Sequence, residues 1–398
     1  MLNLFRVRGY PPFFTSRFFN SVATWVDFIL IFTVLSFSFN LSVRDLGLAA
    51  ALYGFPGLLL GPLIGQLADR NSPALILLLS SFFRFITSLI LATATNPDVF
   101  LLAVFLKGIS NLGMIPSEQI IIRKILSDEQ IVHTTALTTI VDQCTKIISP
   151  LIGSSLAIID SSQNGFYFTA ILALMSATLC LRLATVIGWQ SNPNANRSLL
   201  PDFKFLYKII RKNQQFFSAF SVVLISSLTL GLYDSILTIL LREKGLLSSA
   251  FGIIVSFTAI GAIFCGSIYK KINSSFSNVS LMLLGLVGFS VTVITAGILS
   301  ILFTKVSLVI FCIIWFVNGF CYSCIIMSYS ILLQREAPTD MLGVISSSVR
   351  SLQLTALVTG PVVGSWFAHY FSVSFTFIGA GGLGLISAIY FIRNYKIV

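Results

Sequence analysis

The residues in this sequence with the most chemical potential are charged side chains embedded in long apolar runs. Asp27 lies well inside the first run, and none of its helix neighbours three or four positions away is a cation. A charge at the centre of a bilayer costs about 2.5–3.5 kcal/mol, so it persists where it pairs or faces water. We therefore expect Asp27 to find a partner on another helix, and it is our first candidate for proton chemistry.

Asp142 and Lys146 form a second charged group, four residues apart with the acid first. That order suits an ion pair on one helical face. The pair would either neutralise itself, which lowers the cost of insertion, or hold a proton-responsive carboxylate that substrate releases. Under the second interpretation Asp142 and Lys146 take part in proton coupling.

Two polar stripes at helical spacing could line a wet cavity. The first stripe is partly charged and consists of Lys107, Asn111, Met114 and Glu118. The second is aromatic and uncharged and consists of Trp315, Asn318, Tyr322 and Tyr329. Glu118 could instead pair with Lys124, or add to the proton-coupling acids. Tyr233 and Asp234 end another apolar run, where Asp234 would either cap an outer gate or face headgroup water.

Arginines also occur inside apolar runs, each among hydroxyl or amide side chains at helical spacing. Arg84 has serines and threonines three and four positions away, and Arg350 has Ser346, Ser347 and Gln353. Such neighbours make a guanidinium tolerable in a membrane. Arg350 would serve either as a counter-ion for Asp27 or Asp142 or as a structural residue.

The sequence offers little support for an enzyme, a metal or an organic cofactor. It has two histidines, His133 and His369, which lie near the ends of expected spans on opposite sides of the membrane, so no metal site can be built from them. Neither a nucleotide-binding P-loop nor a nucleophile elbow occurs. Cys321 and Cys324 have C-x-x-C spacing, but they lie inside an apolar run and are expected to be small packing residues.

Composition identifies the elements that must position these residues. Hydrophobic residues make up 56% of the 398 residues and charged residues 10%, whereas soluble domains carry about 25% charged residues. Since a helix needs roughly 20 residues to cross the hydrocarbon, the chain has room for twelve transmembrane helices. We expect an all-α polytopic membrane protein.

Basic residues gather on one side of these expected spans, which places both termini in the cytoplasm. The net charge of +11 is therefore explained by membrane topology and not by nucleic-acid binding. The polar stretch 190–212 separates an N-terminal six-helix half, 1–189, from a C-terminal one, 213–398. Within it, residues 203–210 would form either a short amphipathic helix on the membrane surface or part of a solvated linker.

Internal repetition supports two related halves. Ser149, Pro150 and Gly153 recur 211 positions later as Gly360, Pro361 and Gly364. Gly65 with Arg70 is echoed 201 positions later by Gly266 with Lys271. Gly54, Gly57, Gly61 and Gly65 also share one helical face, which allows close packing of helices in lipid.

The spacing of Gly65, Asp69 and Arg70 resembles the signature loop between helices 2 and 3 of major facilitator superfamily transporters. The preceding Pro56-Gly57-Leu-Leu-Leu-Gly61-Pro62 resembles the macrolide, multidrug and siderophore efflux branch of that family. Arg17, Ser21 and Trp25 fit the opening helix of this branch, and residues 115–119 fit the end of its fourth helix. At position 118 the branch usually has a basic residue, so Glu118 reverses the sign.

The resemblance implies two pseudo-symmetric six-helix halves that rock about a substrate site near the midplane. It implies that spans 1, 4, 7 and 10 line the cavity, which places Trp25, both polar stripes, Tyr233 and Asp234 there. The signature residues Gly65, Asp69 and Arg70, the Gly-Pro pairs and Arg350 are expected to act in gating. It also implies export, driven by a proton gradient with no cofactor, by a monomer in the cytoplasmic membrane of a bacterium.

These expectations combine into a proton-coupled exporter of an organic small molecule such as a drug, a macrolide or a siderophore. Two alternatives stay open: a lipid or lysolipid flippase on the same fold, and a membrane scaffold or receptor that transports nothing. Flux through purified protein in liposomes separates the transporter from the scaffold, and lipid scrambling identifies the flippase.

Overall fold

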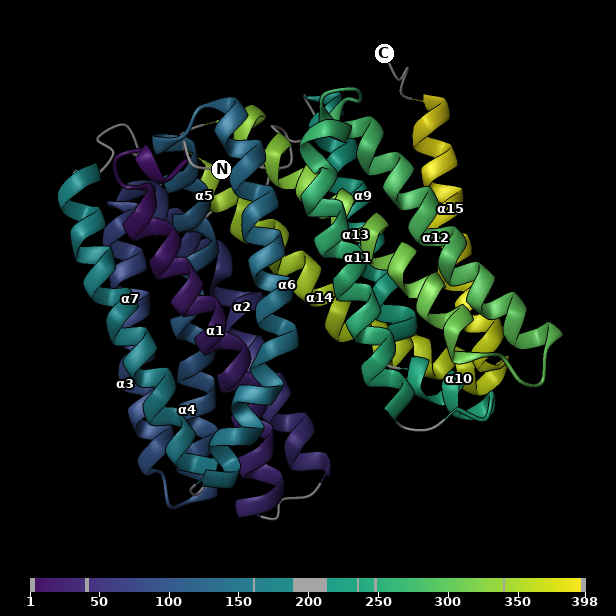
Figure 1. Cartoon of the computed structure of the whole chain (residues 1–398), viewed down its shortest axis with the longest axis horizontal. Helices are drawn as coiled ribbons and strands as arrows, with labels where there is room; N and C mark the ends of the chain where they lie inside the picture. The colour runs from purple at the N-terminus through teal and green to yellow at the C-terminus, as the bar shows by residue number, and fades with distance from the viewer. Residues whose placement is uncertain are drawn as a thin grey trace. The chain divides into compact units, whose positions relative to one another are not determined.

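The computed structural model describes residues 4–39, 43–159, 162–188, 213–234, 236–246, 249–338 and 341–394 (Figure 1). The expected linker and its amphipathic helix, within 190–212, lie outside these residues. The described residues form helices without any strand, which confirms the expected all-α fold.

The first part of the chain forms α1 (Tyr10–Thr33), α2 (Val43–Arg70), α3 (Pro73–Thr93), α4 (Pro97–Ser110), α5 (Met114–Ile125), α6 (Asp128–Ile159) and α7 (Gly165–Ile187). Short turns η1 (Leu4–Arg6), η2 (Val34–Ser38) and η3 (Ser162–Asn164) adjoin them. Pro73 and Pro97 each occupy the first turn of a helix, where a missing N–H is tolerated.

The second part forms α9 (Gln214–Asp234), α10 (Leu237–Glu243), α11 (Ser249–Asn273), α12 (Asn278–Leu302), α13 (Leu308–Glu336), α14 (Leu342–Tyr370) and α15 (Val373–Asn394). Among the described residues, nine helical segments are long and apolar enough to span a membrane, with α4 and α5 counted as one. The other long helices, α1, α6 and α14, carry Asp27, Asp142 and Arg350 and complete the twelve expected spans.

The helices separate into two compact units. The first unit is made by residues within Met1–Ile131, Cys144–Leu206 and Ala337–Ser351, and the second by residues within Val132–Gln143, Tyr207–Glu336 and Leu352–Val398. The long helices α6 and α14 contribute segments to both. The functional boundaries at 189 and 213 stay predictions.

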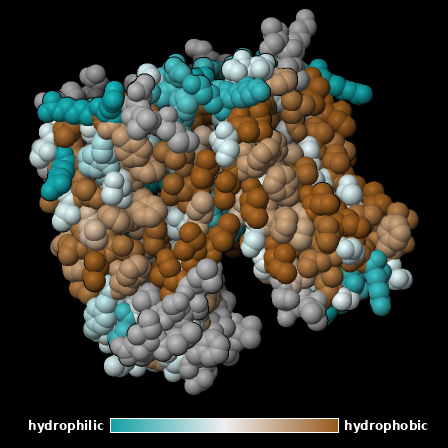
Figure 2. All heavy atoms as spheres, in the orientation of Figure 1, coloured by the Kyte–Doolittle hydropathy of each residue, from teal (hydrophilic) through white to brown (hydrophobic). Residues whose placement is uncertain are grey.

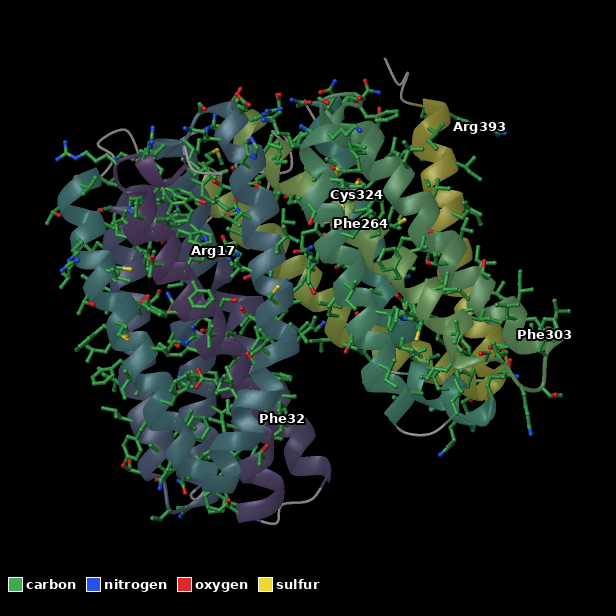
Figure 3. The ribbon with its side chains drawn as sticks, in the orientation of Figure 1. Arg17, Phe32, Phe264, Phe303, Cys324 and Arg393 are labelled. Carbon is green, nitrogen blue, oxygen red and sulfur yellow. The ribbon has the colours of Figure 1, made fainter. Side chains whose placement is uncertain are left out.

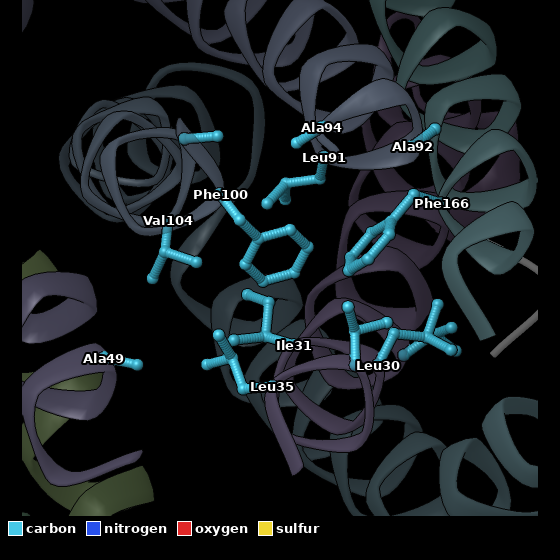
Figure 4. Close-up of a cluster of buried hydrophobic side chains, with 13 residues drawn as sticks. Leu30, Ile31, Leu35, Ala49, Leu91, Ala92, Ala94, Phe100, Val104 and Phe166 are labelled. Atoms are coloured by element: carbon cyan, nitrogen blue, oxygen red, sulfur yellow. The ribbon is translucent and has the colours of Figure 1, made fainter. Parts of the chain in front are cut away.

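In the first unit α7 packs along both α1 and α3, and α4 packs along α2 and α3. One apolar core of this unit joins Leu30 and Ile31 of α1 to Leu91, Phe100 and Phe166 (Figure 4). The rings of Phe100 and Phe166 meet edge to face at 5.9 Å. This core fixes α1, α3, α4 and α7 around the charged residues described below.

In the second unit α13 packs along α11 and α12, and α15 packs along α12 and α9. A Cβ atom at Gly261 would overlap the carbonyl of Phe316, and one at Gly319 would overlap the carbonyl of Thr258. The backbones of α11 and α13 are therefore in direct contact, as small residues permit between membrane helices.

Large apolar side chains are exposed along the helices, as a lipid environment requires. Leu59, Val309 and Ile386 are 60%, 64% and 71% exposed. Figure 2 shows hydrophobic residues over the sides of the helices and hydrophilic residues gathered near helix ends. Such a distribution is that of an integral membrane protein.

Candidate functional site

The carboxylate of Asp27 lies in a fully buried cluster of charges inside the first unit. The Lys107 Nζ of α4 is 2.9 Å from Asp27 Oδ2, and the Arg84 Nε of α3 is 3.7 Å from the same oxygen. All three side chains have no solvent exposure. The expectation that Asp27 needs a partner from another helix is confirmed. Lys107 and Arg84 act as its counter-ions, the role that was considered for Arg350.

Arg84 is held by α1 as well as by the carboxylate. Its guanidinium donates to the backbone carbonyl of Asn20 at 3.0 Å and to the Thr24 hydroxyl at 2.6 Å. The sulfur of Met114 lies 3.7 Å from the same group. The hydroxyls on its own helix explain how Arg84 is tolerated in a membrane, but they do not identify it as a counter-ion of Asp27.

Lys107 was expected on a wet, cavity-lining face, and this is wrong because its side chain is fully buried. Besides Asp27, its ammonium donates to the hydroxyl of Ser88 and to the backbone carbonyl of Arg84. With all groups ionised, Asp27, Arg84 and Lys107 carry one excess positive charge. Since moving an ion out of water costs several kcal/mol, this unbalanced burial is expensive.

The expected stripe on span 4 is interrupted, because α4 ends at Ser110 and α5 begins at Met114. At this break Asn111 donates through Nδ2 to the Tyr53 hydroxyl of α2 at 2.8 Å. Met114 is buried beside Arg84. Because of the helix break, Asn111 contacts Tyr53 and Met114 contacts Arg84, and the stripe does not form one continuous face.

Glu118, the last member of this stripe, forms an ion pair with Arg17 of α1. Arg17 Nε lies 3.1 Å from Glu118 Oε2, with exposures of 16% and 14%. Lys124, considered as its partner, donates instead to the backbone carbonyl of Ile187 at 3.2 Å. Arg17 and Phe32 mark two positions along α1 in Figure 3, with Asp27 between them in the chain.

Asp142 and Lys146 both lie on α6 and are half-buried. The Lys146 ammonium lies 5.5 Å from the centroid of the Trp25 ring, a cation–π geometry. The Asp142–Lys146 ion pair and its role in proton coupling stay predictions. Pro150 and Gly153 follow on α6, and their side chains lie outside the described residues.

In the second unit Trp315 and Asn318 of the aromatic stripe lie with Tyr233 in a packed core, which corrects their expected place on the cavity wall. Tyr233, Trp315 and Asn318 are 1%, 4% and 3% exposed. The Tyr233 ring lies 6.4 Å from Trp315 and 5.2 Å from Phe377 of α15. The remaining candidates differ: Tyr322 is half-buried and Asp234, at the end of α9, is exposed.

Asn318 has contacts that correspond to those of Lys107. It lies 211 positions after Lys107, the displacement that relates the Gly-Pro repeats. Its Nδ2 donates to Thr292 of α12 at 2.9 Å, and its Oδ1 accepts from Tyr233 of α9 at 3.4 Å. Lys107 likewise reaches α3 through Ser88 and α1 through Asp27. The residue at this shared position is thus a charged lysine in the first half and a neutral asparagine in the second.

Asp69 binds the first turn of α14. Its carboxylate accepts from the backbone N–H of Gly343 at 2.7 Å and of Val344 at 2.8 Å, where a helix N-terminus favours negative charge. Close packing supports this contact, since a Cβ at Gly65 would overlap Gly343. Asp69 and Gly65 therefore contact the start of α14, while the gating roles of Gly65, Asp69 and Arg70 stay predictions.

The remaining motif residues lie on α14. A Cβ at Gly360 would meet Gly231 at 2.6 Å, and one at Gly364 would overlap the Leu232 carbonyl, so α9 and α14 approach closely here. Pro361 lies inside the helix between them. Arg350, nearer the N-terminus of α14, is exposed, and its gating role stays a prediction.

Long apolar helices in two internally related sets, with a buried ion cluster in one, define a polytopic membrane transporter. The chain belongs to the Major Facilitator Superfamily, because the model of that family matches residues 13–354 and 219–396.

Individual relatives agree with this assignment. The chain is 23% identical to an uncharacterized MFS-type transporter, YfiS, from Bacillus subtilis (strain 168), over 96% of this chain and 93% of that protein. Its fold is similar to that of a bacterial homologue of the iron transporter ferroportin in an outward-facing state, with a TM-score of 0.79 and 14% identity, over 97% of this chain and 99% of that one.

Two further solved structures share the fold. The human organic anion transporter MFSD10 (TETRAN) has a TM-score of 0.74 at 16% identity, over 95% of this chain and 97% of that one. The proton:xylose symporter XylE has a TM-score of 0.71 at 14% identity, over 97% of this chain and 95% of that one. At these identities the likeness establishes the fold alone.

Proposed function

We propose that this protein is a proton-coupled exporter of an organic small molecule, working by alternating access. The observation that carries the proposal is the ion cluster of Asp27, Arg84 and Lys107, fully buried at the centre of the first unit. A fold needs no such cluster for stability, since buried ion pairs are often replaceable by apolar residues at little cost. Buried ionisable groups in membrane helices are typical of ion-coupling sites.

The coupling step follows from the charge balance. When Asp27 takes up a proton, Arg84 and Lys107 lose their common counter-ion and repel each other across α3 and α4. When Asp27 releases the proton, the three helices are drawn together again. Protonation therefore biases the packing of α1, α3 and α4, and a conformational change that moves these helices is linked to proton binding.

Direction, coupling ion and location complete the proposal. Export follows from the resemblance of the Gly54–Arg70 stretch to efflux transporters, and proton coupling is also named for the structurally similar XylE. The Bacillus relative supports a bacterial membrane. The distribution of basic residues supports cytoplasmic termini.

The test is flux in liposomes that contain the purified protein. Cationic drugs, macrolides and iron chelators are screened with and without an imposed pH gradient. For any molecule transported, Asp27→Asn is expected to abolish acceleration by the gradient, and Glu243→Gln, an exposed carboxylate on α10, is the matched control. Full gradient-driven transport in both Asp27→Asn and Asp142→Asn would refute carboxylate coupling.

A further inference from the structure

An aromatic patch lies on the surface of the first unit beside the ion cluster. It consists of Trp25, Phe28 and Phe32 of α1 and Tyr53 of α2. Phe28 is central, with ring distances of 6.3 Å to Trp25, 4.9 Å to Phe32 and 6.4 Å to Tyr53. Phe28 is exposed and the other three rings are half-buried, so the patch can be reached from outside the unit.

Cationic and hydrogen-bonding groups surround this aromatic patch. The Lys146 ammonium lies 5.5 Å from the Trp25 ring centroid. On the other side, the Tyr53 oxygen accepts from Asn111 at 2.8 Å, so its own proton can be donated to a ligand. Tyr53 also lies within electrostatic range of both Arg84 and Asp27. The Lys146 ammonium and the Tyr53 hydroxyl proton can each bind a negatively charged group.

The charge balance around the patch points the same way. The cations are Lys146, Arg84 and Lys107, and the acids are Asp27 and Asp142, the latter one turn before Lys146 on α6. One positive charge is left over. A cation placed on the patch would add to this excess, whereas an anion would offset it.

We propose that the aromatic patch binds the transported molecule and that this molecule is an organic anion with a flat apolar body. The rings contact the apolar body, and Lys146 binds its carboxylate or sulfonate. Contact with lipid tails alone would explain the exposed Phe28 but not the ammonium beside the rings. The inference rests on the proposed transport function for its meaning, but binding is measured without transport.

The experiment compares three probes of one shape: naphthalene-2-carboxylate, naphthalene-2-carboxamide and 2-naphthylmethylammonium. Binding to the full-length protein in nanodiscs is measured by equilibrium dialysis. The carboxylate is expected to bind about tenfold tighter than the amide, and the ammonium weaker than either. Lys146→Gln removes the preference and Lys146→Arg keeps it. Arg182→Gln, an exposed cation on α7, is the control that leaves it unchanged.

Equal affinity for carboxylate and amide, or no binding of any probe at millimolar concentration, overturns the proposal. So does a carboxylate preference that survives both Lys146→Gln and Phe28→Ala, which would place the anion elsewhere or in lipid. The proposed function fails in a different way: anion binding at the patch without any flux refutes transport and leaves the site intact. If a proton gradient drives the flux of a cation and the patch shows no preference for anions, the proposed site is refuted and the proposed proton coupling stands.

Discussion

Replacing Asp27 by Asn is expected to destabilise the first unit strongly, because the change leaves two buried cations without a counter-ion. At an effective dielectric constant of about 20, the attraction of Lys107 at 2.9 Å amounts to about 6 kcal/mol and that of Arg84 at 3.7 Å to about 4 kcal/mol. These gross attractions are largely offset by the cost of burying the ions. Removing one partner of a buried pair costs about 3–5 kcal/mol, which is the loss we expect.

A double-mutant cycle isolates the interaction from the change in shape. Asp27→Asn and Lys107→Met both keep the side-chain length nearly constant. The double variant leaves only Arg84 charged. Its loss of unfolding free energy should therefore be smaller than the sum of the losses in the two single variants. We expect an interaction energy of about 2–3 kcal/mol between positions 27 and 107, within the range found for contacting residues.

The free energy of unfolding is measured for the four proteins in bicelles by steric trapping. Glu243→Gln, on the exposed surface of α10, should change it by less than about 0.5 kcal/mol. Additivity of the two single changes to within about 0.5 kcal/mol would refute the buried ion pair. Transport by the double variant, if it is folded and no longer responds to a pH gradient, separates loss of coupling from loss of folding.

Three further predictions concern helix contacts in the two units. Asp69→Asn removes the charge that binds the first turn of α14, and hydrogen exchange of the Gly343 amide should become at least several-fold faster. Gly319→Val forces α13 away from the Thr258 carbonyl and should greatly reduce the yield of folded protein; Gly252→Val, where a Cβ meets nothing within 4 Å, is the matched control. Asn318→Leu leaves buried hydroxyls without their amide and should cost about 1–3 kcal/mol in unfolding free energy, with no change in the pH dependence of flux.

Much of the fold could be predicted because its causes are local in sequence. Apolar run lengths give the spans, and the glycine face of α2 predicts a close helix contact, seen where a Cβ at Gly65 would overlap Gly343. The need of Asp27 for a partner also follows from its own helix neighbours. The identity of that partner does not, because it depends on how α3 and α4 are rotated about their axes. Rotation is set by packing over whole helices, as in the core around Phe100.

The errors in the expected site have a common physical origin. A polar stripe on a membrane helix can face water or the interior of its own bundle, and spacing cannot separate these two. Lys107 faces the interior because Asp27 and Ser88 are there to receive it. Trp315 does so because Tyr233 and Phe377 pack against it. The helix break after Ser110 is accompanied by Gly113, where the absence of a Cβ allows Ile76 of α3 to pack closely. A single glycine in a sequence does not, however, predict a helix break.

The unequal chemistry of the two halves is the strongest argument that the ion cluster serves function. Lys107 and Asn318 occupy related positions and join corresponding helices, so the fold accepts either a charge or a neutral amide there. In the second unit Asn318 meets the phenol of Tyr233 and needs no counter-ion. The first unit instead carries Asp27, Arg84 and Lys107, with a net charge that burial penalises. Because a neutral amide suffices for packing in the second unit, packing alone does not explain the charged cluster of the first, and a change of charge on proton binding is the role that we propose for it.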